Sequence, residues 1–139
     1  MGPYVSKCLV CEDVLRNNLA NYCRRCGNIL SKVEAGRGKN DATPYVQAMR
    51  KGWDKEDECF KCHYSGIQLN DDDPRDPRYI TFDYTALEKG AEMVVTAALI
   101  DEMKANLSEA EFKTVITQLA QHFTDGSPVD VSIFNIKHY

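Results

Sequence analysis

The chain has 139 residues, of which 43% are hydrophobic and 27% are charged. This length fits one domain, or one domain with a small appendage. No run of apolar residues approaches the roughly 20 that span a bilayer, so we expect no membrane partner. The first residues lack the apolar stretch of a signal peptide, which predicts a cytoplasmic and therefore reducing environment.

The net charge of −4 is distributed unevenly along the chain. Residues 1–70 carry 11 basic and 8 acidic residues, whereas residues 71–139 carry 6 basic and 13 acidic residues. Basic residues are densest within 16–51, where they are Arg16, Arg24, Arg25, Lys32, Arg37, Lys39, Arg50 and Lys51. Such a stretch favours contact with phosphates, or else forms a solvated helix face. We therefore expect DNA or RNA to bind through this segment, with a protein partner as a further possibility.

The six cysteines form three pairs with two residues between the members of each pair. Eleven residues separate Cys8 and Cys11 from Cys23 and Cys26, a spacing typical of a four-thiolate zinc site. Disulfides rarely persist in a reducing compartment, so the pairs predict metal binding rather than cross-links. We expect these four thiolates to share one Zn²⁺, and Gly27 to adopt a positive φ after the second pair.

Cys59 and Cys62 form the third pair and supply only half of a four-coordinate zinc site. The histidines available to complete it are His63, which directly follows Cys62, and His122 and His138. Alternatively, this pair joins one of the earlier pairs and leaves the other without a metal. The sequence leaves both arrangements open.

The remaining pattern predicts an α+β chain. Apolar spacing together with proline and glycine positions predicts helices at 28–39, 44–53, 91–105 and from Ser108 to Phe123, and a strand at 79–84. Ser108 and Glu111 have the spacing of a capping box. The apolar tail, 129–139, fits a strand or a short helix that lies on the core. Charged residues 54–58 suggest a boundary between a zinc unit with a basic helical segment, 1–53, and a second domain, 54–139.

Residues from Cys59 to Tyr84 resemble the HNH endonuclease motif, a ββα-metal hairpin that is often stabilised by zinc in a treble-clef style. The resemblance rests on the C-x2-C knuckle, the arm containing Gly66, Ile67 and Leu69, the acidic loop 70–78 and a strand that ends in Asp83-Tyr84. It implies a small zinc-stabilised α+β domain with zinc knuckles, a short β-hairpin and two packed C-terminal helices.

The resemblance also implies phosphodiester chemistry with Asp83 as a candidate ligand for Mg²⁺ or Mn²⁺. The strand in HNH proteins typically ends in Asp-His, and that histidine is the general base. Tyr84 takes its position here, and a phenol, with a pKa near 10, is a poor base at neutral pH.

We therefore predict a zinc-binding, nucleic-acid-associated protein related to HNH nucleases whose catalytic residues have been replaced. One alternative is a structural zinc-ribbon adaptor in a protein assembly, with the acidic C-terminal half as its docking surface. Another is an active metal-dependent endonuclease.

Overall fold

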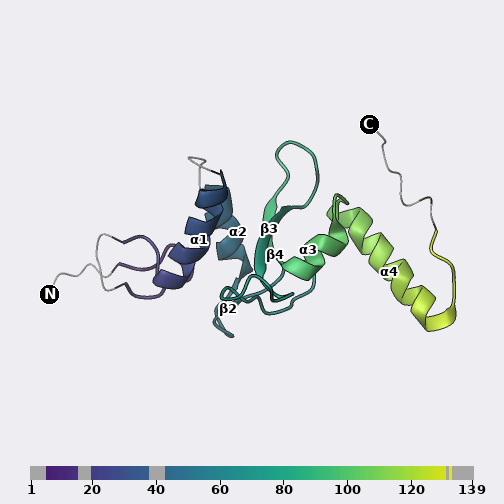
Figure 1. The fold of residues 1–139 in the computed structure, drawn as a ribbon, viewed down its shortest axis with the longest axis horizontal. Coiled ribbons are helices and arrows are strands. Elements are labelled where there is room, and N and C mark those ends of the chain that lie inside the picture. Colours follow the sequence, from purple (N-terminus) through teal and green to yellow (C-terminus); the bar gives the residue numbers. More distant parts are fainter. Residues whose placement is uncertain (1–5, 16–19, 38–42, 131, 133–139) are drawn as a thin grey trace.

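The computed structural model describes residues 6–15, 20–37, 43–130 and 132. These residues form helices and two short antiparallel sheets, which confirms the predicted α+β class. In chain order the elements are α1 (Arg24–Arg37), α2 (Thr43–Gly52), β1 (Trp53–Asp54), β2 (Cys59–Phe60), β3 (Ile80–Tyr84), β4 (Met93–Ala97), α3 (Ala98–Lys104) and α4 (Glu109–Asp125). Figure 1 shows α1 and α2 beside the β3–β4 hairpin, with α4 extending away from them. Within the described ranges, no helix is long and apolar enough to cross a membrane.

Helix α2 packs on strand β4 and determines how closely the two can approach. Its buried face consists of Tyr45, Ala48 and Met49. At its C-terminus, a Cβ atom added to Gly52 would lie 2.2 Å from Cγ2 of Val95. Only a residue without a side chain fits there, so Gly52 allows the helix end to contact the sheet directly.

The β3–β4 hairpin corrects one sequence prediction. We expected a helix over 91–105, but residues Met93–Ala97 form β4 and the helix begins only at Ala98. β4 pairs antiparallel with β3, from Ile80 opposite Ala97 to Tyr84 opposite Met93. Every residue of β4 is buried, and four of its five side chains are apolar, with Thr96 the exception, so the strand lacks an alternating pattern. A short run of this kind fits a buried strand and a buried helix equally well.

The segment 54–58, which we predicted to separate two domains, is the turn of a small hairpin. Strand β1 pairs with β2, and Trp53 lies opposite Phe60 with ring centroids 4.8 Å apart. One continuous core contains residues from both sides of the predicted boundary; they include Cys8, Leu30, Met49, Phe60 and Val95. The division of the chain into two domains stays a prediction.

Helix α4 begins after Ser108, as the sequence predicts, and ends at Asp125, two residues beyond the predicted Phe123. The Ser108 hydroxyl accepts a hydrogen bond from the backbone N–H of Glu111, and the Glu111 carboxylate accepts one from the N–H of Ser108. At the other end, Gly126 adopts the left-handed conformation with φ of 80°. Because both signals are local, they specify this helix without tertiary contacts. Residues 133–139 of the predicted apolar tail lie outside the described part of the chain.

Candidate functional site

Cys8, Cys11, Cys23 and Cys26 form the one cluster of potential metal ligands found in the described residues. Their four sulfur atoms all lie within 4.8 Å of one another. Cys11 Sγ and Cys23 Sγ are 3.7 Å apart, close to the roughly 3.8 Å expected between thiolates in a tetrahedral zinc site with Zn–S distances near 2.3 Å. Three of the four cysteines are buried, and Cys23 is partly exposed. The sequence therefore predicted this cluster correctly.

The first cysteine pair lies in a short hairpin. Lys7 bridges to Val14, and the backbone N–H of Cys8 donates to the carbonyl of Asp13 at 2.8 Å. Inside this turn, the N–H of Val10 points at the Cys8 sulfur, 3.5 Å away. The positive φ that the turn requires, 67°, falls on Glu12 directly after the first pair. Our placement of it at Gly27 was wrong.

The second cysteine pair lies at the N-terminus of α1. Cys23 precedes the helix, and its sulfur accepts the N–H of Cys26 at 3.4 Å, in the manner of an N-cap. Gly27 therefore lies in the first turns of a regular helix, and α1 begins earlier than the predicted residue 28. The positive end of the helix dipole favours thiolates at this position.

The four thiols differ in how readily they ionise. For Cys8, burial opposes ionisation, but the backbone N–H groups around its sulfur outweigh burial and lower its pKa to about 7. Burial, together with the neighbouring sulfurs, raises the pKa of Cys11 to about 12 and also raises that of Cys26. Four thiolates cannot remain charged at such short distances without a cation between them. The cluster is thus suited to a divalent metal ion that prefers sulfur ligands, and zinc fits best.

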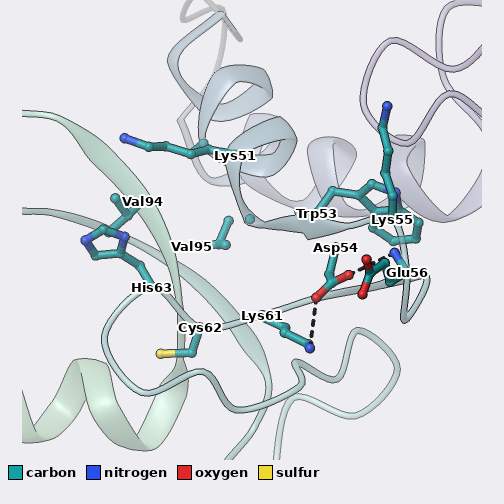
Figure 2. Close-up of a pocket in the computed structure, with 12 residues that line it drawn as sticks. Lys51, Trp53, Asp54, Lys55, Glu56, Lys61, Cys62, His63, Val94 and Val95 are labelled. Atoms are coloured by element: carbon teal, nitrogen blue, oxygen red, sulfur yellow. Dashed lines mark hydrogen bonds and ion pairs between the residues drawn. The ribbon is translucent and has the colours of Figure 1, made fainter.

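The structure does not bring Cys59, Cys62 and His63 into a comparable cluster. The Cys62 sulfur lies 3.3 Å from the hydroxyl oxygen of Thr96, and Nε2 of His63 lies 2.8 Å from Oε1 of Glu109. Figure 2 shows the Cys62 sulfur and the His63 imidazole pointing in different directions. In the described ranges, neither thiol joins two further ligands close enough to share an ion. Zinc binding by these three residues stays a prediction.

Cys62 and His63 instead line a cavity of about 520 Å³ between α2, the β1–β2 hairpin and β4 (Figure 2). Three lysines contribute to its walls, and each pairs with a carboxylate. Lys51 pairs with Glu92, Lys55 with Glu12, and Lys61 with Asp54 and Asp57. The positive charge of this cavity is therefore largely balanced by the protein itself.

Asp83, the candidate Mg²⁺ or Mn²⁺ ligand, contacts a cation from its own chain. Its Oδ2 lies 2.9 Å from Nζ of Lys104, whose side chain is only 2% exposed, and accepts a hydrogen bond from the Tyr64 hydroxyl at 3.0 Å. The same ammonium donates to the carbonyl oxygen of Tyr84 at 3.2 Å. A divalent ion at Asp83 would have to compete with this buried ammonium for the same carboxylate.

The carboxylates of Asp83 and Asp101 and the ring of Tyr64 lie near the Lys104 ammonium. Burial raises the pKa of Asp101, and the charge of Asp83 raises it further, while Lys104 acts in the opposite direction. Burial and the hydrogen bond to Asp83 also raise the pKa of Tyr64. Sequence reasoning missed Lys104, because nothing in its local sequence distinguishes a buried lysine from one on the surface.

The described basic side chains of the segment 16–51 make contacts with different parts of the protein. The Arg25 guanidinium stacks on the ring of Trp53 at 4.7 Å, and Lys32 Nζ donates to the Tyr79 hydroxyl at 3.2 Å. Arg24 and Arg50 are exposed, and within the described ranges neither forms an ion pair. The side chains of Arg16, Arg37 and Lys39 lie outside the described residues.

Comparison of the chain with models of known protein families, with curated proteins and with solved structures gives no match. The structure thus supports an α+β chain with a cysteine cluster that can bind zinc. The resemblance to HNH nucleases rests on the sequence alone and stays a prediction.

Proposed function

We propose that this protein is a zinc-stabilised, nucleic-acid-associated protein with an HNH-like ββα unit that does not cleave its ligand. One observation carries the proposal: the β3–β4 hairpin runs directly into α3. Asp83 and Tyr84 lie at the end of β3, where they contact Lys104 of α3. A hairpin followed by a helix, with Asp83 at the end of its first strand, is the layout that the sequence resemblance implies.

The same contacts argue against hydrolysis. A metal-dependent nuclease needs a carboxylate that is free to bind a cation and a base that is able to activate water. The ammonium of Lys104 already pairs with Asp83, and Tyr84 offers a phenol at the position of the base. Of the two alternatives, the active endonuclease is therefore the less well supported.

Zinc has a structural role in this proposal. Cys8, Cys11, Cys23 and Cys26 supply four protein ligands, which leaves no coordination position for water or substrate. The ion would join the first hairpin to α1, and three of its ligands belong to the main hydrophobic core. Its binding free energy would therefore contribute directly to folding.

Three cations near the zinc cluster are the best candidates for phosphate contact. Lys55 Nζ lies 2.8 Å from a carboxylate oxygen of Glu12, and the positive charges of Lys7 and Arg50 act on the same carboxylate and lower its pKa further. Glu12 directly follows Cys11, so the cations lie beside the cysteine cluster. Exposed ion pairs such as Lys55–Glu12 contribute little to stability and readily exchange their carboxylate for a phosphate.

Binding of a fluorescent DNA duplex and of a single strand, measured between about 50 and 200 mM salt, tests the association with nucleic acid. We expect the affinity of the wild-type protein to fall steeply with salt. The Lys7→Gln, Arg50→Gln, Lys55→Gln variant should show a shallower slope, by up to about one unit for each lost phosphate contact. The matched control replaces Lys89 and Lys113, two exposed lysines of the acidic half, with glutamine. Absence of salt-dependent binding would favour the adaptor alternative.

A plasmid-nicking assay with Mg²⁺ or Mn²⁺ tests the absence of cleavage. We expect no nicking by the wild-type protein. Cleavage by the wild-type protein that is lost in Asp83→Ala would show that the site is catalytic, and would overturn this part of the proposal while leaving nucleic-acid binding in place.

A further inference from the structure

The cavity between α2, the β1–β2 hairpin and β4 has the size and lining of a site for a small organic group. Its volume of about 520 Å³ lies within the roughly 300–1,000 Å³ that is typical of small-molecule sites. Four of the residues that line it are buried, namely Ala48, Cys62, Val94 and Val95. None of these four side chains carries a carboxylate or an ammonium, so the innermost part of the cavity is mainly apolar.

The exposed part of the lining carries both hydrogen-bond donors and acceptors (Figure 2). Lys51, Lys55 and Lys61 provide ammonium donors, and Asp54 and Glu56 provide carboxylate acceptors. The Lys61 ammonium lies 2.9 Å from Oδ2 of Asp54, so opposite charges adjoin on the same wall. Because these charges compensate each other, the cavity suits an uncharged ring with donors and acceptors of its own better than it suits a free phosphate.

Trp53 adds an aromatic wall whose position is fixed by its neighbours. The Arg25 guanidinium lies over the indole at 4.7 Å, and the ring of Phe60 packs against it with a centroid distance of 4.8 Å. Part of the same indole lines the cavity. Aromatic side chains held in this way are the usual contact surfaces for unpaired nucleobases in proteins that bind single strands.

The cavity adjoins the cations that are the candidates for phosphate contact. Lys55 lines the cavity and also pairs with Glu12, the carboxylate on which the charges of Lys7 and Arg50 act. Only a sugar separates the base of a nucleotide from its phosphate. A phosphate that replaces Glu12 at Lys55 would therefore hold a base of the same strand near the cavity.

We infer that this cavity binds one unpaired nucleobase while an adjacent phosphate of the strand contacts Lys55. The inference rests on the proposed association with nucleic acid, and it names the preferred ligand as a single strand or an unpaired base. A base inside a duplex is held by its partner and its stacking neighbours, and entering the cavity would require it to leave the helix.

Two oligonucleotides of equal length test the inference on the zinc-loaded protein. One is a single-stranded DNA, and the other has the same backbone without bases. Both carry the same number of phosphates, so the slope of affinity against salt should be alike for the two. We expect the strand with bases to bind about ten-fold or more tightly.

The fluorescence of Trp53, the one tryptophan in the chain, reports whether a base enters the cavity. Deoxynucleoside monophosphates should change this fluorescence in a saturable manner, whereas deoxyribose 5-phosphate, which lacks a base, should not. Glu56→Phe places a bulky ring in the cavity wall and should weaken the response about ten-fold. The matched control, Asp57→Phe, removes the same charge from the next residue, which is exposed and does not line the cavity, and should respond like the wild-type protein.

The outcomes separate this inference from the proposed function. Equal affinity for the two oligonucleotides, with steep salt dependence for both, would overturn the base-binding cavity and leave the association with nucleic acid in place. Binding of neither oligonucleotide would overturn both. An equal loss of the fluorescence response in Glu56→Phe and Asp57→Phe would trace the effect to charge and would also overturn the assignment to the cavity. Circular dichroism of each variant checks that it remains folded.

Discussion

The ammonium of Lys104 lies 2.9 Å from a carboxylate oxygen of Asp83, and the lysine side chain is almost completely buried. The pair joins α3 to the end of β3 and brings in Tyr64 through its hydroxyl and Tyr84 through its backbone carbonyl. It thus holds the ββα unit together at the place where the sequence suggested a divalent ion.

Replacing Lys104 with methionine should lower the free energy of unfolding by about 3 kcal/mol, because the Asp83 carboxylate is left buried without a counter-charge. Urea denaturation followed by circular dichroism measures this loss. Lys113→Met is the control: Lys113 is exposed and lies 3.5 Å from Glu109, so its loss should change stability by less than about 0.5 kcal/mol.

The double variant Lys104→Met, Asp83→Leu tests the cause of that loss. Removing both charges should recover most of the stability, since the uncompensated charge is then gone. If Lys104→Met is as stable as the wild-type protein, the pair does not contribute as the geometry indicates.

Metal analysis of the purified protein should find one zinc ion per chain. Cys26→Ser should abolish binding, because it removes one of four converging thiolates, and should unfold the hairpin around Cys8. Cys62→Ser should retain the zinc, because its sulfur contacts Thr96 rather than the cluster. Two zinc ions per chain, or a loss of zinc in Cys62→Ser, would instead show a second site at Cys59, Cys62 and His63.

Gly52→Ala should destabilise the protein by about 1–3 kcal/mol. The added Cβ would clash with Val95, a residue that is only 1% exposed. Gly27→Ala should instead stabilise the protein, because alanine stabilises a helix interior by about 0.5–1 kcal/mol relative to glycine. The added Cβ would meet only the Cβ of Tyr22, at an ordinary contact distance of 3.9 Å. Thermal unfolding of the two zinc-loaded variants compares them, and a stable Gly52→Ala protein would contradict the close packing of α2 on β4.

The capping box of α4 should make this helix sensitive to acid. Hydrogen bonds from Ser108 lower the pKa of Glu111, so the folded state favours its carboxylate form. The resulting stabilisation is fully present above the ordinary pKa of a glutamate and is lost as the pH falls through the lowered value. The protection of the α4 amides, measured relative to the exchange rate of an unfolded peptide at the same pH, should therefore fall below about pH 4.5.

Ser108→Ala tests the same capping box at neutral pH, where it should cost about 1 kcal/mol. Thr114→Ala, at an exposed position inside the helix, is the control and should be close to neutral. A pH profile that Ser108→Ala leaves unchanged would exclude the capping box as the source of the acid sensitivity.

Local signals in the sequence were sufficient to predict some of these features. The four cysteines of the cluster and the capping box at Ser108 follow from spacings of a few residues, because a metal knuckle and a helix cap are each formed within a single turn. The spacing of apolar residues at Val94, Val95, Ala98, Leu99 and Met103 predicts a helix through Met93–Ala97, and periodicity cannot distinguish a buried strand from a buried helix in so short a segment.

By itself the sequence determined the α+β class, the cysteine cluster and the limits of α4, all of which depend on neighbours along the chain. Only the tertiary structure decided that β4 pairs with β3, that Cys62 lies against Thr96, and that Lys104 is the cation beside Asp83. Each of these contacts joins residues that are at least nine positions apart in the sequence. Which of the possible contacts each residue makes depends on which groups the folded chain removes from water, and the pattern of neighbouring residues does not indicate this.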